Sequence, residues 1–176
     1  MTVFLCREGH SYADTLITPI NDSFVDFILL GVVEPETKRV TRPSIYSEMV
    51  WEQRKRRLLR DGASIDWLVL RNRLSPLQAR NKRDMEDALF SLSERVGFRI
   101  AGGVAERVVY RELFLQGLTM LDTLEDVTDM PFSMSHVAAR QEVRQLMDAL
   151  NLPQIWQRIA PNPANDVGPV TGGVAA

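Results

Sequence analysis

The sequence has few of the residues from which disulfides and metal centres are built. Among 176 residues there is one cysteine, Cys6, and there are two histidines, His10 and His136. A single cysteine excludes an internal disulfide, so we expect a reducing, cytoplasmic location. This set of residues gives no recognisable zinc pattern, and no Ser/His/Asp or Cys/His set has credible partners for nucleophilic catalysis.

Long hydrophobic runs are also missing. The apolar start Met1–Cys6 is too short for the core of a signal peptide and is followed by Arg7 and Glu8. No run approaches the roughly 18 apolar residues of a membrane span. We therefore expect no membrane partner.

The glycine-rich motif of a P-loop is absent. No glycine is followed by lysine, so the sequence contains no Gly-x-x-x-x-Gly-Lys-Ser/Thr loop to cradle phosphates and help hold magnesium. No predicted strand ends in an Asp-Thr-Pro-Gly type of turn. Gly102-Gly103 lacks the GxGxxG spacing and a following phosphate lysine, so we interpret it as a turn.

Charge is present but unevenly distributed. The net charge is −2, and 18 of the 21 basic residues are arginine. Between Arg54 and Arg83 there are 10 basic and 2 acidic residues, whereas Asp84–Asn151 has 12 acidic and 6 basic. The two runs Arg54–Arg60 and Arg80–Arg83 are able to neutralise nucleic-acid phosphates, but a charge run is more often a solvated helix face.

The most informative stretch is Asp66–Leu70, a short apolar run bounded by Gly62 and by Arg71-Asn72-Arg73. Such a run predicts a strand buried on both faces of a parallel sheet. Ligands bind beyond the carboxyl ends of such strands. Asn72 is able to read a base edge, but asparagine also suits a turn after a strand. Arg71 and Arg73 alternate sides, so at most one of them faces a ligand.

Strands and helices alternate along the chain, which indicates an α/β fold with a mostly parallel sheet flanked by helices. We predict strands at Asp14–Ile20, ended by Pro19, and at Phe98–Ala101. The predicted helices are a short one at Phe24–Leu30 that Asn21-Asp22-Ser23 can cap, one at Ile45–Arg60 with the apolar stripe Tyr46, Met49, Val50 and Leu58, and one at Glu106–Leu115. A further helix runs from Pro76 to about Val96 on the apolar residues Met85, Ala88, Leu89, Leu92 and Val96, and Gly97 ends it. A last helix is capped by Ser135 and has Ala139, Val143, Leu146, Met147 and Leu150 facing inward. Gly31–Pro43 is a loop or a hairpin, and Arg107 and Arg111 either extend a basic surface or pair with Glu106 and Glu112.

Five stretches together resemble the MipZ family, the division-plane-positioning ATPases of the ParA/MinD (deviant Walker) P-loop superfamily. They are Thr18–Phe27 (TPINDSFVDF), Arg42–Lys55 (RPSIYSEMVWEQRK), Asp66–Leu74 (DWLVLRNRL), Gly97–Ile100 (GFRI) and Arg107–Phe114 (RVVYRELF). The resemblance runs from about residue 13 to about residue 150. One small departure is Ile28, which stands where the family usually has aspartate.

The resemblance implies a doubly wound α/β fold, of which this chain matches the C-terminal portion. The family binds ATP and magnesium, dimerises around ATP, binds DNA non-specifically on the nucleoid, forms a gradient from ParB and blocks FtsZ assembly. The family's P-loop half has no counterpart here. We therefore expect an atypical segment over residues 1–12, a partial domain over 13–150 and a disordered tail over 151–176, in a truncated chain that binds ATP and magnesium weakly and does not hydrolyse ATP.

Position by position, the resemblance assigns few site residues. Asn72 matches the family's adenine-side asparagine, and Arg73 follows it in the same motif, so both are cofactor-binding candidates. Arg80 and Arg107 match arginines on the family's DNA-binding surface, and Arg83 lies near them. The phosphate lysines and magnesium ligands match nothing here. The alternative function is a residual DNA- or protein-binding module that uses the basic surface, or an inactive fragment.

Overall fold

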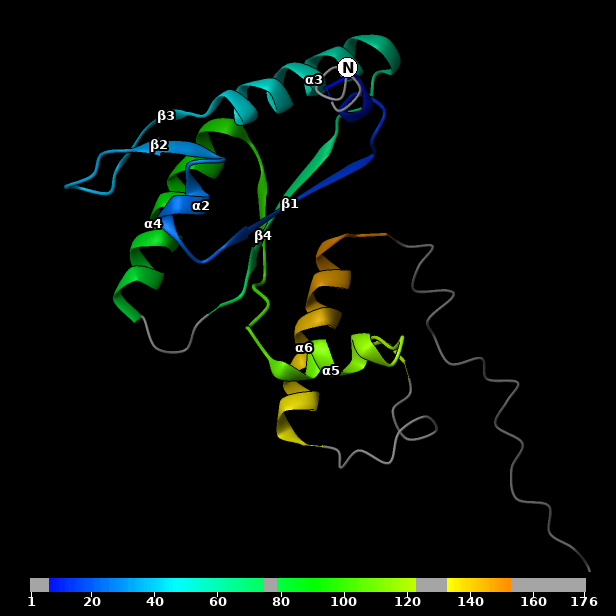
Figure 1. Ribbon diagram of the computed structural model, residues 1–176. Coiled ribbons are helices and arrows are strands. Elements are labelled where there is room, and N and C mark those ends of the chain that lie inside the picture. The colour runs from blue at the N-terminus through cyan, green and yellow to red at the C-terminus, as the bar shows by residue number, and fades with distance from the viewer. Residues whose placement is uncertain (1–6, 75–78, 123–132, 153–176) are drawn as a thin grey trace, which may run out of the picture.

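The computed structural model describes residues 7–74, 79–122 and 133–152, with the backbone alone at residues 79–81. Its centre is a three-stranded parallel sheet in the order β1-β4-β5, formed by β1 (Thr15–Asn21), β4 (Asp66–Asn72) and β5 (Arg99–Ala101). Figure 1 shows β1 and β4 running together through the middle of the molecule. The predicted parallel sheet is confirmed.

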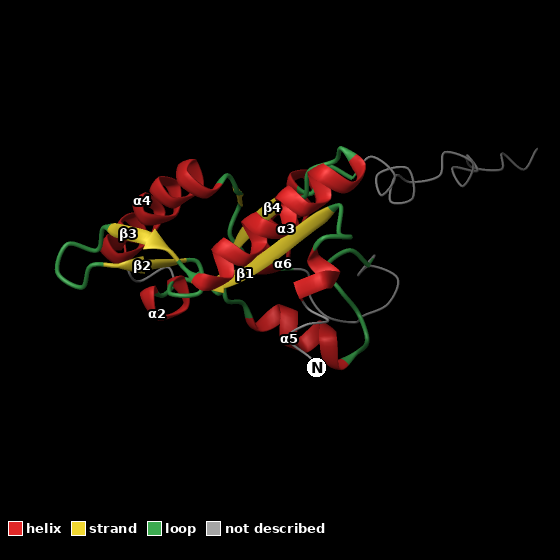
Figure 2. Ribbon diagram, turned by 90° about the horizontal axis from the view of Figure 1, so that it is seen from above, coloured by secondary structure: helices red, strands yellow, loops and turns green. Residues whose placement is uncertain are grey.

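The helices lie on both faces of this sheet (Figure 2). One face carries α3 (Ile45–Asp61) and α4 (Ala79–Val96), the two crossover helices, together with the short α2 (Phe24–Phe27). The other face is covered at β4 and β5 by α6 (Met134–Ala149), which also packs on α5 (Val108–Leu115). The α/β fold class expected from the sequence is therefore confirmed.

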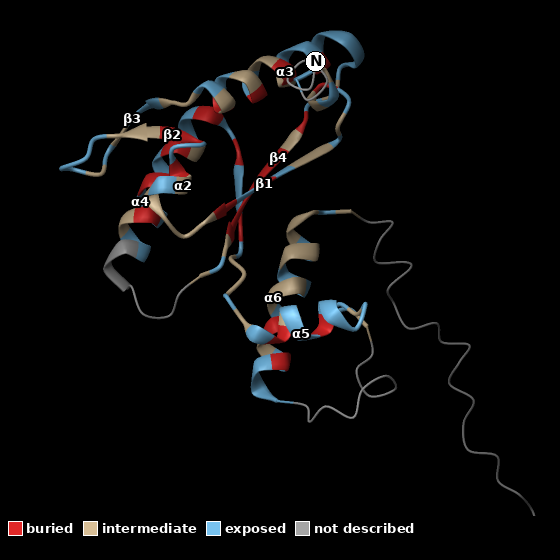
Figure 3. Cartoon of the chain, in the orientation of Figure 1, coloured by how far each residue is buried: buried red, intermediate tan, exposed pale blue. Residues whose placement is uncertain are grey.

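β4 is the best-buried element, as the apolar run predicted. Its central residues from Trp67 to Arg71 are all buried, and Figure 3 shows this strand in the colour of buried residues along most of its length. Trp67 and Val69 pack toward α3 and α4, while Leu68 and Leu70 pack toward α6. Burial on both faces is the property of a central parallel strand.

The residues predicted to cap α2 and to end α4 are confirmed at two positions. Ser23 is the N-cap of α2, although α2 ends at Phe27 rather than Leu30. Gly97 ends α4 in the left-handed conformation, with φ of 79°, and its amide donates to the Ser93 carbonyl. The apolar stripe predicted for α4 is buried as expected, at Met85, Ala88, Leu89, Leu92 and Val96.

Other details of the prediction were wrong. Pro19 does not end β1 but lies inside it. Leu58, assigned to the buried stripe of α3, is 53% exposed, while Gln53 and Arg57 are buried. Ser133, not Ser135, is the N-cap of α6.

The remaining expectations concern connections. Gly31–Pro43 is a hairpin of β2 (Gly31–Val33) and β3 (Val40–Pro43). α4 begins at Ala79, and the predicted start at Pro76 lies outside the described residues. Of the tail over 151–176, only the first two residues are described.

Candidate functional site

The carboxyl ends of β1 and β4 place two asparagines side by side. Asn21 and Asn72 are register partners, and the Asn72 amide nitrogen Nδ2 lies 3.5 Å from Asn21 Oδ1, to which it donates. Both residues are half-buried, so their side chains are accessible at the edge where parallel sheets bind ligands. The structure thus puts Asn72 where the sequence predicted a ligand site. Asn21 was missed there, although it ends the neighbouring strand.

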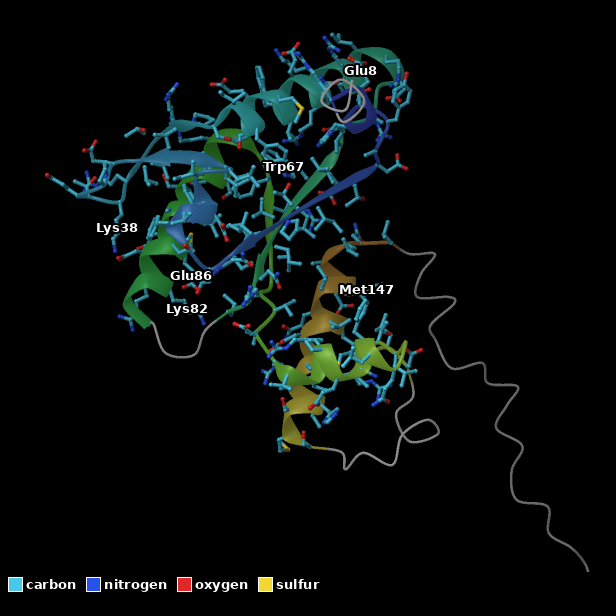
Figure 4. The ribbon with its side chains drawn as sticks, viewed as in Figure 1. Glu8, Lys38, Trp67, Lys82, Glu86 and Met147 are labelled. Atoms are coloured by element: carbon cyan, nitrogen blue, oxygen red, sulfur yellow. The ribbon has the colours of Figure 1, made fainter. Side chains whose placement is uncertain are left out.

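Arg71 does not face a ligand. It is 5% exposed, and its guanidinium forms ion pairs of 2.5 Å with Asp22, in the loop after β1, and with Glu86 on α4. Glu86 is labelled on α4 in Figure 4. Arg71 therefore links strand, loop and helix beneath the site. A buried arginine needs such partners, and the arginine within a buried strand was the signal that predicts them.

Arg73 turns the chain out of β4. Its backbone adopts the left-handed conformation, with φ of 54°, and its exposed side chain forms an ion pair with Glu106 at 2.8 Å. Glu106 lies in the segment after β5, so the pair ties two strand-end segments together. The guanidinium remains 60% exposed, which leaves it accessible to a ligand beside Asn72.

The segment after β5 runs alongside the end of β4 rather than turning tightly at Gly102-Gly103. The Val104 amide donates to the Arg71 carbonyl at 2.9 Å, and the Leu74 amide donates to the Val104 carbonyl at 3.0 Å. A Cβ atom at Gly103 would come within 2.1 Å of Leu74 Cδ1. The interpretation of Gly102-Gly103 as a turn is therefore wrong. A side chain at Gly103 would have to displace the Leu74 side chain, because the two segments approach closely.

A hollow of about 440 Å³ lies beside these segments, between α4 and β5. Its lining includes Arg71, Glu86 and Gly103 and the apolar residues Phe90 and Ile100. The hollow adjoins the site but does not include Asn72 among its lining residues.

Arg107 is engaged inside the protein. Its Nη2 and Nε donate to the carboxylate of Glu142 on α6 at 2.7 and 3.4 Å, and that carboxylate also accepts from the Tyr110 hydroxyl at 3.1 Å. Burial alone would raise the pKa of Glu142, but the hydrogen bonds from Arg107, the Ala105 amide and Tyr110 lower it below its usual value. One of our two interpretations of the sequence paired Arg107 with Glu106. The structure instead pairs Arg107 with Glu142 and Glu106 with Arg73.

The cations of α3 are likewise used internally. Arg54 donates to the Val96 and Gly97 carbonyls at the end of α4, Arg57 pairs with Asp14, and Arg60 donates to the Ser11 carbonyl. Arg56 pairs with Glu8, and Lys55 pairs with Glu52. The α3 part of the expected basic surface therefore consists mainly of structural contacts.

Lys82 and Arg83 differ from these residues. Both are exposed on the first half of α4, and neither forms an ion pair with another described residue. Figure 4 marks Lys82 at this end of α4. Arg80 lies one turn earlier on the same helix, and its side chain lies outside the described part of the structure.

Among the described residues, no group of three or more histidine, cysteine, aspartate or glutamate side chains is arranged to hold a metal ion. In the same residues, no helix is long and apolar enough to cross a membrane.

The fold defines the class of the protein as an α/β protein with a three-stranded parallel sheet flanked by helices, which is consistent with part of a P-loop-like, Rossmann-type fold. The sequence matches the family described as ATPase MipZ over residues 2–154. Because this covers most of the chain, the protein belongs to the MipZ family of ATPases. A search of curated proteins finds no match.

Proposed function

We propose that this protein acts in division-plane positioning, with the ParB and FtsZ proteins as its partners, and that the 176-residue chain does not itself hydrolyse ATP. The family assignment over residues 2–154 carries the first part. The second part rests on a contrast within the nucleotide site. This chain supplies residues that can contact the base, but no loop that can bind the phosphates.

The residues present fit a nucleotide base. A carboxamide offers both a donor and an acceptor to a base edge, and Asn72 holds its carboxamide at the carboxyl end of β4 beside Asn21. The exposed guanidinium of Arg73 lies on the next residue. In this account Asn72 orients the base, and Asn21 holds the Asn72 carboxamide in place.

The residues present do not fit a triphosphate with its magnesium ion. The sequence has no Gly-Lys pair and hence no phosphate-binding loop of the P-loop kind. The exposed cation next to Asn72, Arg73, already forms an ion pair with Glu106. Backbone amides and one lysine carry much of the recognition of a polyphosphate. We therefore derive no hydrolytic step for this chain.

Phosphate release by the purified chain in Mg-ATP tests this proposal. We expect a rate no higher than that of the Asn72→Ala variant under the same conditions. Equilibrium dialysis completes the test, because a site with base contacts alone binds adenosine, ADP and ATP with similar, weak affinity. Turnover above the Asn72→Ala control, or ATP affinity far above that of adenosine, would refute the proposal.

A second candidate function is weak, non-specific DNA binding through α4. The observation that favours it is that Lys82 and Arg83 are exposed and form no ion pair with another described residue, with Arg80 on the same helix. If these residues neutralise two or three phosphates, the logarithm of the binding constant should fall against the logarithm of salt concentration with a slope of roughly −2 to −3.

The test of DNA binding compares the removal of positive charges from α4 with their removal from α3. Lys82→Gln with Arg83→Gln should abolish retardation of a DNA fragment at low salt, whereas Lys55→Gln with Arg56→Gln on α3, where the cations already pair with Glu52 and Glu8, should leave most of it. Equal loss from both variants, or no retardation of the unmodified chain at low salt, would exclude this role.

A further inference from the structure

Asn21 ends β1 on a backbone that several contacts hold in place. Its register partner is Asn72 at the end of β4, and its carbonyl accepts from the Ser23 amide at 2.8 Å. The next residue, Asp22, forms an ion pair with Arg71, whose side chain is only 6% exposed. The end of β1 is therefore tied both to the neighbouring strand and to the turn that follows, and the Asn21 side chain projects from a fixed position.

Asn72 lies between two residues whose side chains are also engaged. Arg71, before it, is held by two carboxylates beneath the edge of the sheet, and Arg73, after it, pairs with Glu106 at 2.8 Å. The left-handed backbone of Arg73 ends the strand immediately after Asn72. Because the backbone is fixed on both sides, the groups that Asn72 presents depend on rotation of its carboxamide, which exchanges the places of Oδ1 and Nδ2.

Within the described residues, Asn21 is the only hydrogen-bond partner of the Asn72 carboxamide. Asn72 Nδ2 donates to Asn21 Oδ1 at 3.5 Å. The oxygen and the nitrogen of a carboxamide lie on opposite sides of its carbon atom, so Nδ2 lies against β1 and Oδ1 points away from it. The contact uses one of the two Nδ2 hydrogens and leaves Oδ1 available. On its open side, Asn72 therefore offers a ligand an acceptor and one remaining donor, in a fixed order.

We propose that Asn21 determines the base specificity of the strand-end site. By accepting from Nδ2, Asn21 holds the Asn72 carboxamide in one orientation. Oδ1 then selects a base that carries an amino donor next to a ring nitrogen, as a 6-aminopurine does, and the remaining Nδ2 hydrogen donates to that ring nitrogen. This inference rests on the proposed function, because it concerns the same site. It assigns the selection to Asn21 as a positioning residue, which acts through Asn72 without touching the base.

A purine without the amino group is the ligand that this arrangement should reject. Its ring nitrogens only accept hydrogen bonds, so no group on its edge can donate to Asn72 Oδ1, which loses water on binding and gains no partner. Both asparagines are half-buried, so that loss is felt. Without the Asn21 acceptor the Asn72 carboxamide is free to rotate, and Nδ2 can then donate to a ring nitrogen of either purine. The preference should therefore depend on Asn21.

Equilibrium dialysis of the full chain with adenosine and with purine riboside, which lacks only the 6-amino group, tests this inference. We expect the unmodified chain to bind adenosine roughly tenfold more tightly than purine riboside. Asn21→Leu removes the acceptor and should make the two affinities similar. Asn21→Asp should keep the preference, because a carboxylate can only accept and so imposes the same orientation on the Asn72 carboxamide.

The matched control is Thr15→Val. Thr15 lies at the opposite end of β1, where it is the register partner of Asp66. Like Asn21 it is half-buried, so its substitution also removes a polar group from β1 but leaves the strand-end site intact. We expect this variant to keep the preference of the unmodified chain for adenosine. A cooperative thermal transition in each variant shows that folded chains are being compared.

The possible results separate this inference from the proposed function. If the unmodified chain binds neither nucleoside, the base site itself is refuted, and this inference falls with it. Equal binding of both nucleosides by the unmodified chain, or an unchanged preference in Asn21→Leu, would overturn the inference alone. A preference that is lost or reversed in Asn21→Asp would mean that Asn72 presents Nδ2 rather than Oδ1 to the base, and would overturn the inference even if Asn21→Leu does not fold.

Discussion

Arg107, immediately before α5, donates hydrogen bonds from two nitrogen atoms of its guanidinium to the carboxylate of Glu142 on α6. The contact joins residues 35 positions apart and links the start of α5 to α6, the helix that covers the second face of the sheet. The family resemblance assigns this arginine to a DNA-binding surface, but in this chain it also connects the start of α5 to α6. We therefore expect substitution of Arg107 to lower the stability of the fold, whatever its effect on DNA binding.

Glu142→Gln should make the protein less stable at neutral pH by about 1–3 kcal/mol, because a charged acceptor of several hydrogen bonds is replaced by a neutral one. Since the folded-state pKa of Glu142 is lowered, its contribution is complete above the usual glutamate range and is lost as the pH falls through the lowered value. Urea unfolding between about pH 7 and about pH 3 should therefore show a smaller acid loss in Glu142→Gln than in the unmodified chain. Glu112→Gln, at an exposed position of α5, should keep the full acid loss.

Arg71→Met should destabilise the protein by about 3–5 kcal/mol, because it leaves the Asp22 carboxylate, 8% exposed, without its cation. Urea unfolding monitored by circular dichroism measures the change. The double variant with Asp22→Asn should recover much of the loss, since no charge is then left buried. Glu86→Gln is the control, because Glu86 is 49% exposed and its removal should cost less than about 1 kcal/mol. Equal costs for Arg71→Met and Glu86→Gln would mean that Asp22 is not the partner that matters.

Gly103→Ala should destabilise by about 1–3 kcal/mol, because the new methyl group collides with Leu74 at the crossing of the two strand-end segments. Gly102→Ala should be neutral or slightly stabilising, since its nearest contact, Gln145 Oε1, is 3.6 Å away. The same urea measurement compares the two neighbours. A neutral Gly103→Ala variant would show that the segments separate more readily than their hydrogen bonds indicate.

Elements with a strong local pattern were predictable from the sequence. The apolar run of β4 and the three- and four-residue spacing of α4 each determine one arrangement, and both were placed correctly. The site edge followed from β4, because Asn72 comes directly after the buried run.

The wrong predictions have a common cause. A local sequence pattern does not determine which residues are buried or where a strand ends when contacts with distant segments decide it. Pro19 continues β1 because its nitrogen faces outward, a fact that depends on which side β4 lies. Arg57 is buried in place of Leu58 because its guanidinium reaches the Ala13 carbonyl and Asp14. Glu142 lies beside the apolar stripe of α6, and its half-buried partner Arg107 comes from a segment 35 residues away, which no local pattern reveals.

A thermal melt of the purified chain, with adenosine or with Mg-ATP, tests the central claim most directly. A ligand that binds only the native state raises the midpoint, and at a given concentration the rise is larger for a tighter ligand. The account predicts one cooperative transition whose midpoint rises slightly and equally with both ligands, and does not rise in Asn72→Ala. A midpoint raised much further by Mg-ATP than by adenosine would contradict it, because the chain would then hold the phosphates that its sequence gives it no loop to bind.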